Sequence, residues 1–131
     1  MQDFLLAVGR VALVAIFVWS AYGKLTGLPG FTNMLASKGV PQAALVAPLA
    51  ALVEIAGAVM VIIGFKTRYA AAALMVFTAV ALYIAHDFWN LSGPARNTQM
   101  IQAWKNLSII GGLLVLAGIG PGRFSVDERH G

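Results

Sequence analysis

The chain has 131 residues, of which 60% are hydrophobic and only 11% are charged, with a formal net charge of +4. A soluble domain carries about 25% charged residues, so a chain this small could not cover its apolar surface in water with so few. Its apolar residues suffice for about four membrane-spanning helices of ~20 residues each. The composition therefore excludes an ordinary soluble enzyme. It predicts one all-α domain, residues 1–131, folded as an integral membrane four-helix bundle.

The charge pattern and the lack of cysteine exclude further classes of protein. The nine Lys and Arg residues are spread singly along the chain, which argues against nucleic-acid binding. Without cysteine, the chain has no thiolate ligands for an iron–sulfur cluster or zinc and no dithiol centre. A haem held by two His is not expected, because His130 lies in the terminal tail. We expect no metal site, and any electron chemistry would need a bound cofactor.

The first predicted span covers residues 4–22 and is interrupted only by Arg10. Because no basic side chain precedes it and Arg10 breaks its apolar run, we expect a retained span rather than a signal peptide. Residues 23–41 are rich in Gly, Pro and polar side chains, which is typical of a loop. A short interfacial helix is expected around residues 31–37 of this loop.

The second predicted span, residues 43–64, contains one ionisable residue, Glu54. A mid-span carboxylate costs about 3 kcal/mol on insertion, and the Leu, Ile and Val residues of the segment offset this cost. The connection at residues 65–68 is so short that the third span, residues 69–85, must return antiparallel beside the second.

A polar loop with several aromatic residues follows, and the fourth span lies within residues 100–119. A Gly-Pro-Gly sequence then ends the helix, so the tail, residues 120–131, is predicted to be polar and exposed. Four spans running up-down-up-down place both termini on one side of the membrane. Arg10, near the amino end, tips the positive-inside rule towards a cytoplasmic location for both termini.

Two groups of ionisable residues could carry chemistry, and the first is buried in the spans. Steps of three and four residues place Arg10 and Lys24 on one face of the first span. Glu54 lies among small residues that let another helix approach closely, so its carboxylate should point into the bundle. We expect Arg10 and Glu54 to form an ion pair. The pair would either be structural or mark a site for a polar head group or for protons.

The second group should gather at the opposite end of the bundle. Lys24 ends the first span, His86 follows the third, and Lys105 and Asn106 lie early in the fourth. One interpretation is an aromatic belt with charges that extend to the lipid head groups. The other is a polar mouth for an anionic or quinone-like head group, with His86 able to transfer protons near neutral pH. The candidate ligand-binding residues of both groups are Arg10, Lys24, Glu54, His86, Lys105 and Asn106.

The order and spacing of these residues resemble the DoxX family of small four-helix membrane proteins. The resemblance is carried by Arg10, by residues 20–25 (SAYGKL), by Glu54 in its small-residue helix, and by residues 64–68 (GFKTR). The characteristic positions of the family correspond here to Arg10, Gly23, Lys24, Glu54, Gly64 and Arg68.

The later part of the chain is similar to a narrower branch, that of small bacterial inner-membrane DoxX-like proteins. The matching segments are residues 86–89 (HDFW), Lys105 with Asn106, and residues 120–127 (GPGRFSVD). The resemblance implies a multi-pass protein of the prokaryotic cytoplasmic membrane. The family takes its name from a subunit associated with a thiosulfate:quinone oxidoreductase, and other members are linked to oxidative-stress responses.

Three functions are consistent with these residues. The leading hypothesis is a membrane subunit of a redox or oxidative-stress-protective system that binds a quinone or similar amphiphile near Lys24, His86 and Lys105. A redox partner protein would then deliver the electrons. The alternatives are a small-molecule or proton transporter acting as a homo-oligomer around Arg10 and Glu54, or a noncatalytic anchor that holds soluble partners through the tail. Enzymatic activity of the chain itself stays open.

Overall fold

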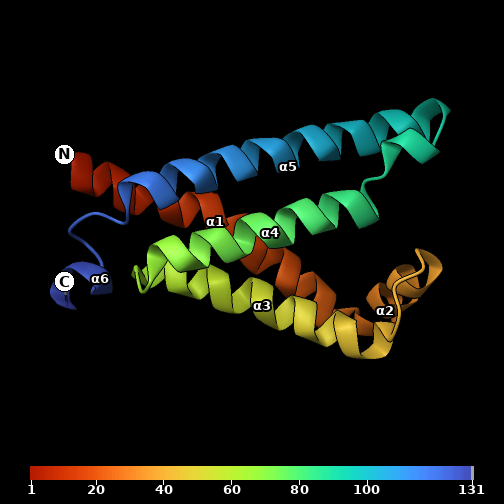
Figure 1. The fold of residues 1–131 in the computed structure, drawn as a ribbon, viewed down its shortest axis with the longest axis horizontal. Coiled ribbons are helices and arrows are strands. Elements are labelled where there is room, and N and C mark those ends of the chain that lie inside the picture. The colour runs from red at the N-terminus through yellow and green to blue at the C-terminus, as the bar shows by residue number, and fades with distance from the viewer. Residues whose placement is uncertain (131) are drawn as a thin grey trace.

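The computed structural model describes residues 1–130, without the side chains of Arg129 and His130, and over that range it contains helices and no strand (Figure 1). The elements in chain order are α1 (Gln2–Thr26), α2 (Leu28–Ser37), α3 (Ala43–Ile63), α4 (Thr67–Ala85), the short 3₁₀ helix η1 (Phe88–Asn90), α5 (Gly93–Ile119) and α6 (Val126–His130). Helices α1, α3, α4 and α5 are each long and apolar enough to cross a membrane. The predicted all-α membrane fold is therefore confirmed.

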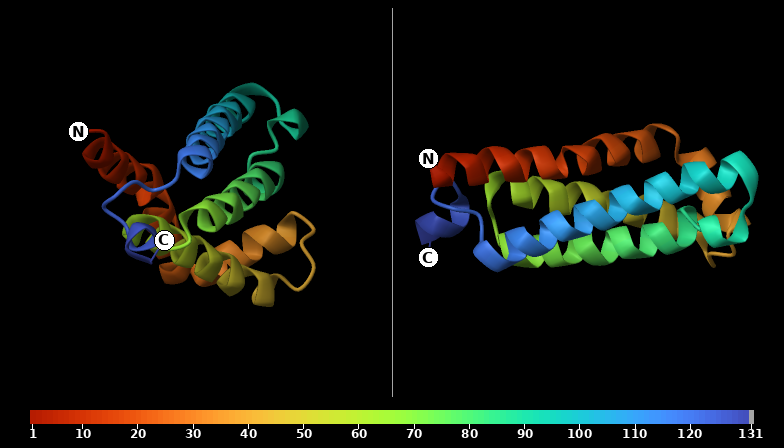
Figure 2. Two further views of the ribbon diagram at one scale, coloured as in Figure 1. Left: turned by 60° about the vertical axis from the view of Figure 1, so that its left-hand side comes forward. Right: turned by 90° about the horizontal axis from the view of Figure 1, so that it is seen from above.

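The four long helices alternate in direction, as the sequence predicts. In Figure 1, α1 and α4 run one way and α3 and α5 run the other, so the two termini lie at the same end. We call this the terminal end, and the opposite end, which carries α2 and η1, the loop end. Helix α3 packs between α1 and α4, while α5 packs mainly on α4 and contacts α1 less (Figure 2). The cytoplasmic location of the terminal end stays a prediction.

Two helices extend further than hydropathy indicates. Helix α1 continues past residue 22 to Thr26, and α5 begins at Gly93 instead of near residue 100. At 1.5 Å per residue, α5 is about 40 Å long, longer than the ~30 Å hydrocarbon core of a bilayer. Its first turns are polar and exposed. Hydropathy detects the part of a helix that suits lipid and misses the part that projects beyond it.

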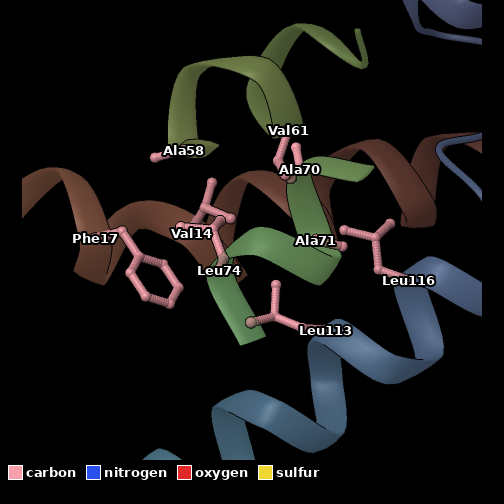
Figure 3. Close-up of a cluster of buried hydrophobic side chains, with 9 residues drawn as sticks. All are labelled: Val14, Phe17, Ala58, Val61, Ala70, Ala71, Leu74, Leu113 and Leu116. Atoms are coloured by element: carbon pink, nitrogen blue, oxygen red, sulfur yellow. The ribbon is translucent and has the colours of Figure 1, made fainter. Parts of the chain in front are cut away.

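A small-residue interface holds the long helices together. The buried residues of α3 include Ala47, Ala51, Gly57 and Ala58, the face predicted to surround Glu54. Figure 3 shows the central cluster, in which Ala58 of α3 and Ala70 and Ala71 of α4 lie among larger side chains of the long helices. Leu74 of α4 fits against the bare backbone of Gly57, where an added Cβ would lie 2.9 Å from the Leu74 Cγ. Such close contacts replace the hydrophobic driving force that is absent between helices in lipid.

The prediction of an exposed tail is wrong for Gly120, Pro121 and Ser125, although Arg123, Phe124 and Glu128 are exposed as predicted. Gly120, Pro121 and Ser125 are buried, because the chain after α5 turns back across the terminal end of the bundle (Figure 1). Ser125 packs on Gly64, at the end of α3. Beyond these residues, Gly131 and the side chains of Arg129 and His130 lie outside the part of the chain that the structure describes.

The Gly57–Leu74 contact makes the first prediction. We expect Gly57→Ala to lower the free energy of unfolding by about 1–3 kcal/mol, because the fully buried Leu74 has no room to move away. Gly111→Ala on α5 is the matched control, since its added Cβ meets nothing within 4 Å. Thermal unfolding in one mild detergent measures both, and equal stabilities of the two variants would contradict the packing argument.

Candidate functional site

A buried ion pair between Lys24 and Glu54 lies at the centre of the candidate site. Lys24 Nζ donates to Glu54 Oε1 at 2.9 Å and to Ser20 Oγ at 2.5 Å. The Glu54 side chain is only 3% exposed, so its carboxylate depends on Lys24 for a neutralising charge. The ammonium also lies 5.4 Å from the ring centre of Phe31 and 5.5 Å from that of Phe77, within cation–π range.

The predicted Arg10–Glu54 pair is therefore wrong, and helix geometry gives the reason. Arg10 and Lys24 lie on the buried face of α1, as expected, but side chains in an α-helix lean towards its N-terminus. Arg10 consequently points towards the terminal end and away from Glu54. Lys24, 14 residues further along, leans back towards the middle of the bundle and reaches the carboxylate. Counting the rise along each helix places the Cα atoms but ignores this lean.

Arg10 is held instead by backbone carbonyl groups. Its guanidinium donates to the carbonyl oxygens of Val61 at 2.9 Å and Ile62 at 3.3 Å, in the last turn of α3. It also donates to Pro121 at 2.6 Å and to Phe124, both beyond the end of α5. The last carbonyls of a helix have no partner within the helix and carry partial negative charge. One buried cation thus caps the end of α3 and fixes the segment that follows α5 against it.

The tail is fixed a second time by the carboxylate of Asp127. Its Oδ1 accepts the backbone N–H of Lys66 at 2.6 Å, and its Oδ2 accepts the N–H and the hydroxyl of Thr67 at 2.9 and 2.8 Å. These are the first donors of α4, so Asp127 caps that helix from 60 residues away. The Asp127 N–H in turn donates to the Gly64 carbonyl at 2.8 Å. We call residues 121–127, with Arg10, the terminal clasp.

Gly64 allows the clasp to close. It ends α3 with φ +73°, a left-handed conformation that favours glycine, and a Cβ there would lie 2.2 Å from Ser125 Cβ. Only a residue without a side chain can meet both requirements. Gly64 and Arg10 therefore hold the same turn of the tail.

Two cavities meet at Lys24. The smaller has a volume of about 100 Å³, and its polar lining comes from Ser20, Lys24, Glu54, Thr78 and Asn106. This volume has room for roughly three water molecules. The larger, about 310 Å³, lies among α2, α3 and α4 and is lined by apolar side chains such as Phe31, Leu35, Val46, Phe77 and Ile84. Within the described part of the chain, Lys24 is the one charged residue that lines this apolar pocket.

Of the other three predicted site residues, one lies at the cavities and two do not. Asn106 joins Lys24 and Glu54 at the smaller cavity. His86, by contrast, hydrogen bonds through Nδ1 to Gln99 Oε1 at 2.7 Å, and Lys105 is exposed on α5. Neither of these two lines the polar cavity or the apolar pocket. The described residues also include no cluster of three or more His, Asp or Glu side chains that could hold a metal ion.

Several residues of the site and the clasp were not singled out from the sequence. Ser20 lies one helical turn before Lys24, a spacing that could have indicated their contact. Phe31 and Phe77 reach Lys24 from other helices, and no sequence pattern indicates that approach. Asp127 lies in the segment that the sequence predicts to be an exposed tail. Its capping role arises only because the chain turns back after α5 and brings Asp127 to the start of α4.

The clasp has a defined electrostatic signature at Asp127. Partial burial alone would raise the pKa of this carboxyl, but the hydrogen bonds from Thr67 and Lys66, with the positive charge of Arg10, outweigh it and hold the pKa below its ordinary value. A lowered pKa contributes stability above the ordinary Asp value of about 3.9, and this contribution is lost as the pH falls through the lowered value.

We therefore expect Asp127→Asn to reduce stability at pH 7 by about 0.5–1.5 kcal/mol, because the amide has one acceptor oxygen where the carboxylate uses two and so loses a hydrogen bond. The difference from wild type should shrink as the pH falls from about 4 through the lowered pKa, as the wild-type carboxylate becomes protonated. Thermal unfolding between pH 7 and pH 3 in one detergent measures this. Glu128→Gln, which removes the neighbouring exposed carboxylate, is the control. A difference that does not change with pH would contradict the ionic cap.

Comparisons with known proteins agree with the membrane fold. Over 128 residues, the chain is 38% identical to the inner membrane protein YphA of Escherichia coli (strain K12), an alignment that covers 98% of this chain and 91% of that protein. It is 33% identical over 128 residues to the inner membrane protein YqjF of the same organism, covering 98% and 93%.

A more distant similarity reaches eukaryotes. Over 80 residues, the chain is 40% identical to a Surfeit locus protein 4 homolog of Schizosaccharomyces pombe, covering 60% of this chain and 26% of that protein. No solved structure matches the chain. The family model named DoxX matches residues 5–87, which hold the Lys24–Glu54 pair and the first three spans. The chain is therefore a membrane protein of the DoxX family.

Proposed function

We propose that this DoxX protein binds a quinone or a similar amphiphile between its helices, as the membrane subunit of a redox or oxidative-stress-protective system. The observation that carries the proposal is the position of Lys24 at the junction of a polar cavity and an apolar pocket. Ligand sites combine a largely apolar lining with a few placed polar groups. Here the apolar pocket offers one ammonium, supported from behind by Glu54.

The dimensions of the pocket suit a ring rather than a whole lipid chain. Its volume of about 310 Å³ lies at the low end of the ~300–1,000 Å³ range of small-molecule sites. The head group of a quinone would fill it, and a long isoprenoid tail would continue into the surrounding lipid. The rings of Phe31 and Phe77, which flank the ammonium, supply flat apolar walls on which an aromatic head group packs.

The position of the site along the bundle is also suitable. Exposed aromatic rings lie at both ends of the bundle, and towards the loop end Trp19 lies 6.3 Å from Tyr22 and Tyr83 lies 5.8 Å from Trp89, between ring centres. Such rings favour the level of the lipid head groups. Lys24 follows Tyr22 on α1, so an amphiphile with its polar end near this interface would meet the ammonium without crossing the membrane.

The chain's own residues would bind and orient the ligand, and a bound quinone would supply the capacity to accept electrons and protons. The Lys24 ammonium would hold a carbonyl oxygen, and Glu54 would keep that ammonium charged and in place. Electrons would come from a partner protein, because a chain without cysteine has no thiol of its own to oxidise or reduce. His86 and Lys105 line neither cavity, so in this proposal they are not ligand contacts.

The structure does not contain the features on which the transporter and anchor hypotheses depend. A transporter was based on an Arg10–Glu54 pair at mid-membrane, but Arg10 is bound by carbonyls at the terminal end. An anchor for soluble partners was based on an exposed tail, but the tail up to Asp127 is part of the clasp. Neither alternative is favoured by a contact that the structure contains.

Ubiquinone-1, a quinone with a short tail, tests the proposal. Purified protein in lipid nanodiscs should bind radiolabelled ubiquinone-1 saturably, and the double variant Lys24→Met with Glu54→Gln should bind it about tenfold more weakly or not at all. The loss follows because a hydrogen bond from a charged donor contributes about 1.5–3 kcal/mol. Removing both charges together avoids leaving one buried ion without a partner.

Lys38→Met is the matched control for this measurement. Lys38 is also paired with a carboxylate, Asp87 at 2.8 Å, but it is exposed at the loop end and lines neither cavity. Its variant should bind ubiquinone-1 as wild type does. Absence of saturable binding by the folded wild-type protein would overturn the proposal, as would equal loss of binding in the control.

A further inference from the structure

The number of donors left on Lys24 limits what the apolar pocket can recognise. An ammonium has three N–H donors, and among the described residues two of them are taken by Glu54 Oε1 and Ser20 Oγ. One donor therefore remains for a ligand. Since the other lining residues of the apolar pocket are apolar, a bound molecule can satisfy one acceptor there and must bury the rest of its surface against carbon.

The charge of the pair sets a second limit. Lys24 and Glu54 together carry no net charge, and Glu54 lines the polar cavity on the other side of the ammonium. An anionic ligand at Lys24 would place two negative groups beside one cation in a largely buried site. A neutral carbonyl group accepts the remaining N–H and leaves the pair balanced. Unbalanced charge in a low-dielectric site is strongly unfavourable, so the two ligand types differ in affinity.

We infer that the site selects uncharged amphiphiles with a carbonyl acceptor and rejects anionic ones such as fatty acids, and that Glu54 is the residue that sets this selectivity. The inference rests on the proposed function, because it concerns the same pocket. Lys24 by itself would attract any acceptor and would favour a carboxylate. The Glu54 carboxylate neutralises the positive charge of the Lys24 ammonium. Lys24 then offers a ligand one N–H donor but no net charge.

Within residues 1–128, whose side chains the structure describes, no other charged group lines the pocket to alter this balance. Arg10 is occupied by carbonyl groups at the terminal end, and Lys38 is paired with Asp87 at the surface of the loop end. Among the described residues that line either cavity, Lys24 and Glu54 are the ionisable ones. The selectivity therefore depends on two side chains, which makes it open to a direct experiment.

Two competitors of similar length and different charge provide the test. The wild-type protein in nanodiscs is loaded with radiolabelled ubiquinone-1 at pH 8, and 2-undecanone or decanoate is added to displace it. We expect the neutral ketone to compete about tenfold or more better than the anion, because like charges placed together oppose binding strongly. Equal competition by the two compounds would overturn the inference. This comparison needs no variant and so does not depend on the folding of one.

The role of Glu54 is tested by Glu54→Gln, which keeps the shape of the side chain and removes its charge. Lys24 is then unneutralised, and decanoate should gain about tenfold or more in competition relative to the ketone. Circular dichroism and size-exclusion chromatography check that the variant is folded. A folded variant with unchanged selectivity would show that Glu54 does not set it.

The outcomes separate this inference from the proposed function. If wild-type protein binds no ubiquinone-1 saturably, the proposed function fails, and the selectivity of the pocket fails with it. If ubiquinone-1 binds and depends on Lys24, but decanoate displaces it as well as 2-undecanone does, the proposed function stands and the inference is wrong.

Discussion

The structure depends on how two cations on one helix face find hydrogen-bond partners inside the membrane. A buried charge in a bilayer must find its partners within the protein, because neither water nor lipid chains can supply them. Arg10 and Lys24 share the buried face of α1 and meet this requirement in different ways. Arg10 takes four backbone carbonyls at the terminal end, and Lys24 takes the Glu54 carboxylate. The first cation organises the fold, and the second organises the cavities.

The two arrangements follow from the chemistry of the side chains. A guanidinium has five N–H donors in a planar fork, which suits several carbonyl oxygens that diverge from different helix ends. An ammonium is a compact charge with three donors, which suits one carboxylate and one hydroxyl and leaves a donor over. The terminal end is consequently saturated with hydrogen bonds and closed by the clasp. At the site near the loop end, the Lys24–Glu54 pair has no net charge. Lys24 keeps one N–H donor without a partner among the described residues, and it lines an apolar pocket.

Much of the site could be anticipated from the sequence. The scarcity of charges isolated Arg10, Lys24 and Glu54, and helical spacing placed them correctly on buried faces. The choice of partner could not be derived in this way. Helical rise by itself favours Arg10, whereas the register of α1 against α3, which sets Arg10 beside Val61, and the lean of side chains towards the helix N-terminus bring Lys24 to Glu54. His86 lies at the predicted end of the bundle but bonds to Gln99, and Lys105 lies near the middle of α5 with its side chain exposed.

The sequence by itself determined the membrane fold, the number and approximate limits of the spans, and the faces that are buried. These properties depend on local composition and on the 3.6-residue period of the helix, which can be read along the chain. Only the tertiary structure decided that Asp127 caps a helix 60 residues earlier, and that Lys24 lies between Phe31 and Phe77. These contacts join distant segments, and no periodic pattern encodes the direction in which a side chain or a tail turns to meet its partner.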